Sequence, residues 1–270
     1  MRVIKNKLVL ITGGASGIGK LMAFDFAGRG GRVFVWDINQ GQLEQLEKEA
    51  KGRGLSITGM ICDVSDKEEV YKNAGILTEK YGPVDVLINN AGVVSGRTLL
   101  ETPDEKIIRT LNINTLSLFW TVKAFLPGMI ERDSGHIVTV SSAAGIIGVK
   151  GLADYCASKF AAVGFDESLR MELKDRKSRV GTTLVCPYFI DTGMFEGVKT
   201  RLPLLLPILK SGYAARRIVR AVLKNKKRLI MPRFVAAVNL MRIFPPGILD
   251  FCADLCGISR SMDEFKGREA

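Results

Sequence analysis

Histidine, paired cysteines and long apolar runs are scarce or missing in this 270-residue chain. His136 is the one histidine, so a Ser-His-Asp hydrolase is not expected. The five cysteines form no CxxC pair or zinc-like spacing, which predicts reduced thiols and no bound metal. No apolar run reaches roughly eighteen residues, and the first seven residues carry no signal-peptide core. We therefore expect a cytoplasmic protein that does not span a membrane.

Acidic residues are also few near the C-terminus, where most of the net charge of +11 is found. From Gly197 onward there are fifteen lysines and arginines against five acidic residues, and the basic run 216–228 precedes an apolar tail, 234–258. This pattern fits an amphipathic element on an anionic lipid surface. A solvated helix with a tail folded onto its own domain or a partner subunit fits equally well. Aromatic side chains do not interleave with the basic ones, so nucleic-acid binding is not expected.

Short runs rich in Val and Ile alternate with longer segments of helical period, which is typical of βαβ units in a buried parallel sheet. The expected strands are Leu8–Thr12, Arg32–Asp37, Ser56–Val64, Val84–Asn90, His136–Ser142, Thr182–Phe189 and Arg228–Pro232. The expected helices are Ile18–Gly30, Gln40–Lys51, Asp66–Tyr81, Asp104–Glu131, Asp154–Lys174 and Gly212–Lys226. No linker or repeat divides the chain. We predict one α/β domain over residues 1–270, a Rossmann-type doubly wound parallel sheet of about seven strands with helices on both faces.

A glycine-rich turn, Thr12–Gly19, follows the first strand and opens a helix. Such a turn lets backbone N–H groups approach a pyrophosphate closely, although a plain strand-to-helix turn would have the same composition. Asp37 ends the second strand, where a carboxylate can accept hydrogen bonds from an adenosine ribose and repels a 2′-phosphate. The alternative for Asp37 is a helix cap or turn residue. We predict a dinucleotide site that prefers NAD(H) to NADP(H).

Ser142 ends a strand, and Tyr155 and Lys159 follow on one face of a helix at positions i and i+4. A phenol has an ordinary pKa of about 10, and a nearby ammonium group would favour the phenolate. We therefore expect Lys159 to lower the pKa of Tyr155. Taken singly, Ser142 could be a helix cap and Lys159 a surface charge.

The four motifs TGxxxGxG, NNAG, Ser and YxxxK closely resemble the short-chain dehydrogenase/reductase superfamily over nearly the whole chain. The resemblance implies that Tyr155 is the general acid/base, Ser142 orients the substrate oxygen, and Lys159 binds the nicotinamide ribose. It implies that Asn114 holds a water molecule in the proton relay. The sequence departs from the superfamily pattern at Tyr188, which replaces the glycine usual after Pro187. The cofactor contacts implied by the motifs are Gly13, Ser16, Gly17, Ile18, Gly19, Asp37, Asp63, Val64, Asn90, Ala91, Gly92, Tyr155, Lys159, Pro187 and Thr192.

Residues 193–211 stand where the superfamily carries its substrate lid, and they are rich in leucine and proline. Their apolar side chains favour a lipophilic alcohol or ketone, with packing into the core or a subunit contact as the alternative. Longer stretches such as 151–162 and 192–197 are similar to the epidermal-type retinol dehydrogenases and their relatives acting on hydroxysteroids. Residues 212–270 are expected to form the basic and apolar C-terminal extension.

Three functions are compatible with these sequence features. The first is an NAD(P)-dependent oxidoreductase acting on a lipophilic alcohol or carbonyl compound of retinol, steroid or fatty-alcohol type. The second is a dinucleotide-binding module without catalysis, and the third is a peripheral membrane protein. Helices Asp104–Glu131 and Asp154–Lys174 resemble those that pair across a two-fold axis in the superfamily, which implies a homodimer or homotetramer.

Overall fold

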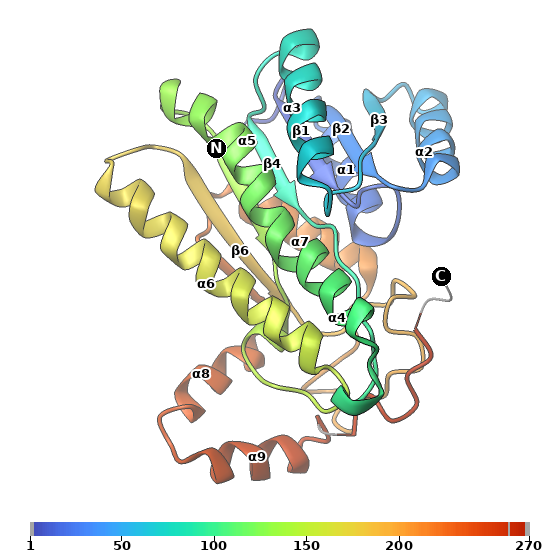
Figure 1. Ribbon diagram of the computed structural model, residues 1–270, viewed down its shortest axis with the longest axis vertical. Helices are drawn as coiled ribbons and strands as arrows, with labels where there is room; N and C mark the ends of the chain where they lie inside the picture. The colour runs from blue at the N-terminus through green and yellow to red at the C-terminus, as the bar shows by residue number, and fades with distance from the viewer. Residues whose placement is uncertain (1–2, 259, 268–270) are drawn as a thin grey trace.

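A computed structural model describes residues 3–258 and 260–267 (Figure 1). Seven parallel strands form one sheet in the order β3-β2-β1-β4-β5-β6-β7. Residues 1–2, 259 and 268–270 of the predicted domain and C-terminal extension lie outside the described residues. The strands are β1 (Leu8–Thr12), β2 (Arg32–Asp37), β3 (Ile57–Ile61), β4 (Val86–Asn89), β5 (His136–Val140), β6 (Gly181–Pro187) and β7 (Arg228–Met231). The doubly wound parallel sheet predicted from the sequence is confirmed.

Both faces of the sheet are buried, as the continuous apolar runs of the strands require. In β1, Val9 and Ile11 pack into the cluster on one face, while Leu8 and Leu10 pack into the cluster on the other. Alternate side chains of a strand point to opposite faces, so each strand contributes to two separate cores. The first core includes Met22 and joins α1 (Gly17–Gly28), α2 (Gln40–Gly52) and α7 (Ser211–Leu223) to the sheet.

The opposite face is covered by α3 (Lys67–Tyr81), α5 (Ser117–Glu131) and α6 (Ala153–Asp175), with the short helix α4 (Asp104–Leu111) packed against α6. The sequence predicted one helix over Asp104–Glu131, and this expectation is wrong in its middle. A π-helical segment, Asn112–Leu116, separates α4 from α5. Single π-turns of this kind are frequent at functional sites, and periodicity does not reveal them.

Strand β3 ends three residues earlier than predicted because the chain turns away at Asp63. The Asp63 carboxylate accepts hydrogen bonds from the backbone N–H of Ser65, at 2.8 Å, and from the Ser65 hydroxyl, at 2.6 Å. Such a local turn competes with the strand ladder. The other strands and helices differ from expectation by a few residues at their ends.

The C-terminal region divides into two parts that lie at opposite ends of β7. The basic residues Lys224–Arg228 form the turn between α7 and β7, at the amino-terminal end of β7. The apolar tail begins beyond the other end of β7 and contains a 3-10 turn (Arg233–Ala237), α8 (Val238–Met241) and α9 (Pro246–Leu255), which protrude below the sheet in Figure 1. The basic run and the apolar tail therefore do not form the single amphipathic element that their succession in the sequence suggested.

Candidate active site

The candidate active site lies at the carboxyl ends of the strands, where the chain order reverses between β1 and β4. Crevices at such a reversal are where open α/β sheets bind their ligands. A cavity of about 600 Å³ extends from Asp37 at the end of β2 to Phe195 beyond β6. This volume is within the range of small-molecule and cofactor sites.

The glycine-rich turn after β1 forms a bare backbone surface on this cavity. Gly13 has φ +60°, and a Cβ atom there would lie 2.8 Å from the Cα of Ala91. A Cβ on Gly19 would lie 2.5 Å from the carbonyl oxygen of Gly13. Gly17 begins α1 with φ +54°. The turn thus depends on missing side chains, and it presents the N-terminus of α1 to the cavity, as a pyrophosphate site requires.

Asn90 joins this turn to the end of β4. Its side-chain amide donates hydrogen bonds to the carbonyl oxygens of Thr12, at 3.0 Å, and Gly13, at 2.9 Å. The Thr12 hydroxyl accepts from the backbone N–H groups of Asn90, at 3.0 Å, and Ala91, at 3.1 Å. These four bonds fix the two strand ends that border the cavity, so the NNAG motif has a clear structural role.

Asp37 is held at the end of β2 by two backbone N–H groups. One carboxylate oxygen accepts from Ala15 at 3.0 Å and the other from Asn39 at 3.2 Å. Each carboxylate oxygen can accept further hydrogen bonds, and the half-buried group lies on the cavity. Asp37 therefore acts as a turn residue, which was one of the alternatives from the sequence, and it also lies where it can contact a ribose.

Ser142, Tyr155 and Lys159 meet at the far end of the same cavity. The backbone N–H of Ala144 donates to the Ser142 hydroxyl at 3.1 Å, and Ser142 forms a hydrogen bond with Tyr155. The Lys159 ammonium group donates to the carbonyl oxygen of Val140 at 3.0 Å and lies 5.6 Å from the centroid of the Tyr155 ring. Strand β5 and helix α6 thus bring together the three side chains, as predicted.

Burial controls the proton affinity of these groups. It raises the pKa of Tyr155 above the ordinary value for a phenol, against the effect of the hydrogen bond with Ser142. Burial lowers the pKa of Lys159 from 10.5 to about 8. The expectation that Lys159 holds the pKa of Tyr155 below its ordinary value is wrong for the protein alone, because loss of hydration disfavours both charged forms.

Asn114 lies in the π-helical segment and is 2% exposed. Its side-chain oxygen accepts from the backbone N–H of Val93 at 2.8 Å, and its amide donates to the carbonyl of Val93 at 2.9 Å and to the hydroxyl of Ser158 at 3.0 Å. The side chain is therefore committed to holding the loop after β4 against α6.

With the exception of Asn114, all the predicted site residues line the 600 Å³ cavity. The structure adds residues that sequence reasoning missed, including Gln42, Arg109 and Ile190. Ile38, which directly follows Asp37 and carries no charge that could hold a 2′-phosphate, also lines the cavity. Arg109 comes from α4, and no sequence signal connects that helix with the glycine-rich turn.

The predicted lid, residues 193–211, contributes to the cavity through Met194 and Phe195. The Phe195 ring packs edge-on against Tyr155, with 5.7 Å between their centroids. Leu206 and Leu209 are instead buried in the core clusters, which is the alternative considered for this segment. Apolar lid residues thus divide between the site wall and the core.

A parallel doubly wound sheet with a bare glycine turn, a held carboxylate and a buried Ser-Tyr-Lys group defines a dinucleotide-dependent oxidoreductase. The family model described as short chain dehydrogenase matches residues 7–202, and the chain belongs to that family. It is accordingly an enzyme that exchanges a hydride between a CH–OH group and a nicotinamide cofactor.

Two curated relatives are similar over nearly all of the chain. "Short-chain dehydrogenase/reductase family 16C member 6" of Bos taurus is 47% identical, covering 98% of this chain and 85% of the relative. "Epidermal retinol dehydrogenase 2" of Homo sapiens is 46% identical, covering 97% and 86%. These similarities confirm the subgroup that the sequence motifs indicated.

Solved structures agree in fold. A short chain dehydrogenase/reductase from Burkholderia phymatum in complex with NAD has a TM-score of 0.81 at 27% identity, covering 90% of this chain and 95% of that chain. The F189W actinorhodin polyketide ketoreductase with NADPH has a TM-score of 0.76 at 30% identity, covering 86% and 97%.

Proposed function

We propose that this chain oxidises a lipophilic alcohol, or reduces the matching carbonyl compound, with Tyr155 as the proton-transfer group. The observation that carries the proposal is the meeting of Ser142, Tyr155 and Lys159 at one end of the cavity whose other end holds Asp37. In this assignment Ser142 orients the substrate oxygen, Lys159 binds the nicotinamide ribose, and Asn114 keeps the site loop in place.

The glycine turn and Asp37 fit a dinucleotide because Gly13, Gly17 and Gly19 line the cavity without side chains at the N-terminus of α1, and Asp37 lies on the same cavity. The cofactor, when bound, supplies the hydride acceptor or donor. In the oxidation direction, the Tyr155 oxygen takes the proton of the substrate hydroxyl while the Ser142 hydroxyl fixes the substrate oxygen. The Lys159 ammonium group is held in place by Val140, and a second positive charge beside Tyr155 would counter the effect of burial on its pKa.

Replacement of Tyr155 by Phe tests this assignment. We expect Tyr155→Phe to lower kcat by about 10²- to 10⁴-fold, because general acid–base catalysis is lost while the ring still packs against Phe195. NADH binding, measured by fluorescence, should change little. The matched control is Tyr71→Phe on α3, where the side chain is 37% exposed. Turnover by Tyr155→Phe at the wild-type rate would refute the mechanism.

NAD is the proposed cofactor in preference to NADP. The support is the Asp37 carboxylate, which lies on the cavity at the end of β2 with no positive charge at Ala15 or Ile38 beside it. A 2′-phosphate would be repelled there. We expect Asp37→Ser to reduce the preference of kcat/KM for NAD over NADP by about tenfold or more, roughly the effect of one like-charge contact. An unchanged ratio would show that selection lies elsewhere.

A lipophilic substrate of retinol, steroid or fatty-alcohol type is supported by the apolar wall and by the relatives. Phe195 contacts Phe189 at 5.1 Å and Phe265 at 6.4 Å between ring centroids. Aromatic walls of this kind favour apolar ligands. The similarity to a protein named epidermal retinol dehydrogenase supports the same class. A panel of retinoids, steroids and straight-chain alcohols, each with NAD and NADP, tests the assignment.

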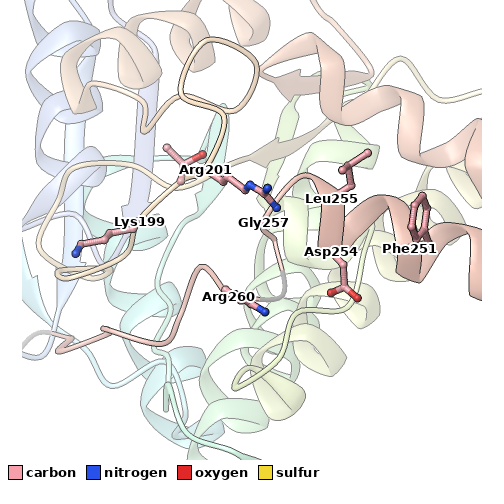
Figure 2. Close-up of a pocket in the computed structure, with 8 residues that line it drawn as sticks. Lys199, Arg201, Phe251, Asp254, Leu255, Gly257 and Arg260 are labelled. Atoms are coloured by element: carbon pink, nitrogen blue, oxygen red, sulfur yellow. The ribbon is translucent and has the colours of Figure 1, made fainter.

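Contact with a lipid surface is proposed for the apolar tail. Between residues 234 and 255 a group of large apolar side chains is exposed, and Arg201 and Arg260 lie beside α9 in Figure 2. Apolar side chains bordered by cations suit the interface of an anionic membrane. The exposed side chains are Phe234, Leu240, Ile243, Phe244, Ile248, Phe251 and Leu255. Among the described residues, no helix has both the length and the apolar character needed to cross a bilayer.

Vesicle flotation tests this contact. We expect the protein to float with vesicles that contain phosphatidylserine, and Phe251→Asp combined with Ile243→Asp to abolish flotation. Ile76→Asp on α3, also at an exposed apolar position, is the control. Equal flotation of all three proteins would argue against the tail as the contact. We place the protein in the cytoplasm, at least partly on a membrane surface, and its five free cysteines agree with a reducing compartment.

A homodimer or homotetramer is proposed through the face formed by α4, α5 and α6. Ile108, Phe119 and Met171 are exposed there despite their size. Burying such a patch against a second copy would remove apolar surface from water. Light scattering after size exclusion should give a dimer mass or a multiple of it, and Phe119→Asp together with Ile108→Asp should shift it to the monomer.

A further inference from the structure

A second cavity, much smaller than the first, lies beside Ser142 and Tyr155. It measures about 30 Å³ and is closed by apolar side chains from the lid, from the segment before α6 and from the C-terminal region. Tyr188, Phe195 and Ile258 are among these side chains. We call it the inner cavity. In this closed arrangement the inner cavity has room for only a very small group, so a longer chain enters it only when the side chains around it move.

A larger cavity of about 620 Å³ lies on the outer side of the C-terminal region (Figure 2). We call it the outer cavity. Phe251 and Leu255 from α9 are its apolar lining residues, and the remaining lining residues are polar, charged or glycine: Lys199, Thr200, Arg201, Asp254, Gly257 and Arg260. The charged ends of long basic side chains can remain at a polar rim while their stems cover apolar surface. Its volume is in the range of small-molecule sites.

The two cavities are separated at Gly257 and Ile258. Gly257 lines the outer cavity and Ile258 lines the inner one. The C-terminus of α9 explains this arrangement, because Gly257, with φ +74°, donates to the carbonyl of Asp254 at 3.0 Å, and Ile258 donates to that of Ala253 at 2.9 Å. These bonds form a Schellman motif, in which glycine reverses the chain and the next residue turns its side chain inward.

Tyr188 completes the separation from the side of β6. Its ring lines the inner cavity, and its hydroxyl forms a hydrogen bond with Thr200, which lines the outer cavity. The Thr200 hydroxyl also donates to the carbonyl of Leu206 at 2.8 Å, which holds Thr200 within the lid. The tyrosine that departs from the superfamily pattern after Pro187 thus joins the lid to the partition.

We propose that the inner and outer cavities are two ends of one substrate channel and that Ile258, with Tyr188, is the gate between them. The inference rests on the proposed alcohol substrate. The hydroxyl-bearing end of a long lipophilic alcohol reaches Ser142 and Tyr155 through the inner cavity, and its tail lies in the outer cavity. Ile258 is therefore a specificity-determining residue for substrate length. Because Phe251 and Leu255 also belong to the proposed lipid contact, the channel opens toward the membrane side of the molecule.

The gate is tested by the ratio of kcat/KM for 1-dodecanol to that for 1-propanol. We expect Ile258→Trp to lower this ratio by about tenfold and Ile258→Ala to raise it, because a change of a few carbon atoms in an apolar passage alters discrimination by about this factor. Leu255→Trp, at a position 57% exposed on the outer cavity, should lower the ratio without disturbing the core.

The controls are Ile76→Trp and Ile76→Ala on α3, at an isoleucine that lines neither cavity. Both should leave the ratio unchanged. Equal effects of the Ile258 variants on the two alcohols, or no effect of Leu255→Trp, would overturn the channel. Failure of the wild-type enzyme to oxidise any retinoid, steroid or straight-chain alcohol of the panel would refute the proposed substrate class itself. If Ile258→Trp is unfolded by circular dichroism, the opposite change expected for Ile258→Ala decides the question.

Discussion

The buried Lys159 should make the stability of this protein rise with pH in a window set by one side chain. Its pKa is about 8 in the folded protein against 10.5 ordinarily, and the side chain is 4% exposed. Between these two pH values the unfolded chain binds more protons than the folded one, so the free energy of unfolding increases with pH. From pH 7 to pH 10 the gain attributable to Lys159 is on the order of 2 to 3 kcal/mol by this linkage.

Lys159→Met removes the titration and isolates this effect. The variant also leaves the carbonyl of Val140 without its hydrogen bond, but that cost does not depend on pH. We therefore measure the difference in unfolding free energy between wild type and Lys159→Met by urea denaturation at pH 7, 8, 9 and 10, at fixed protein concentration. The difference should move in favour of the wild type by on the order of 2 to 3 kcal/mol over this range.

Lys174→Met supplies the control, since Lys174 lies on the same helix with its side chain exposed. Its difference from wild type should stay flat across the same pH range. A flat difference for Lys159→Met as well would refute the conclusion that burial controls this lysine.

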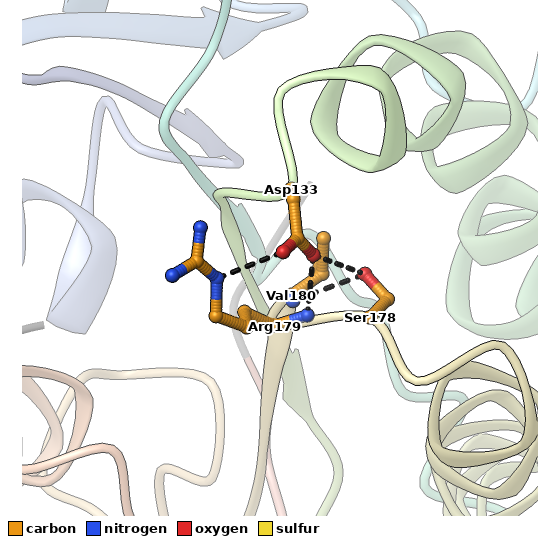
Figure 3. Close-up of polar contacts among 4 residues, drawn as sticks. All are labelled: Asp133, Ser178, Arg179 and Val180. Carbon is orange, nitrogen blue, oxygen red and sulfur yellow. Dashed lines mark hydrogen bonds and ion pairs between the residues drawn. The ribbon is translucent and has the colours of Figure 1, made fainter.

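Three further results are expected. His136 is 2% exposed, and burial lowers its pKa from 6.5 to about 4. The wild type should therefore lose about 3 kcal/mol of unfolding free energy as the pH falls from 7 to 4. His136→Gln should lose less in the same urea titration. The Asp133 carboxylate accepts hydrogen bonds from the backbone and the side chain of Arg179 (Figure 3), and these bonds lower its pKa. Measured by calorimetry, Asp133→Ala should therefore lower Tm at pH 7 and lower it much less near pH 3. Gly19→Ala should weaken NADH binding by about tenfold or more, because the added methyl group meets the carbonyl of Gly13, and an unchanged Kd would contradict the tight turn.

The sheet could be predicted closely because each strand is an apolar run buried on both faces. Leu8–Thr12 and Arg32–Asp37 agree with the structure at both ends, since a glycine-rich turn and an acidic residue mark where the ladder must stop. The cofactor side of the site could be predicted equally well, because it depends on local backbone geometry within Thr12–Gly19. Such features are written into short stretches of sequence.

Properties that depend on contacts between residues far apart in the sequence could not be predicted from the sequence. The direction of the Tyr155 pKa follows from complete burial by the lid, which the spacing of Tyr155 and Lys159 does not report. The inward turn of Ile258 depends on Gly257 at the end of a short helix that the periodicity did not reveal. Likewise, Arg109 reaches the cavity only because α4 is docked on α6. These are tertiary effects, which override local preference.

The π-helical segment at Asn112–Leu116 has a consequence for how this family can change in length. An α-helix turns by about 100° for each residue, so the extra residue in the π-turn sets the angular offset between α4 and α5. Deleting one residue there would restore an uninterrupted helix and rotate everything on one side of it. Asn114 would leave Val93 and Ser158, and the α4 surface proposed for subunit contact would face a different direction. The support of the loop after β4 and the proposed subunit contact therefore share a single point, at which a one-residue deletion would disrupt both.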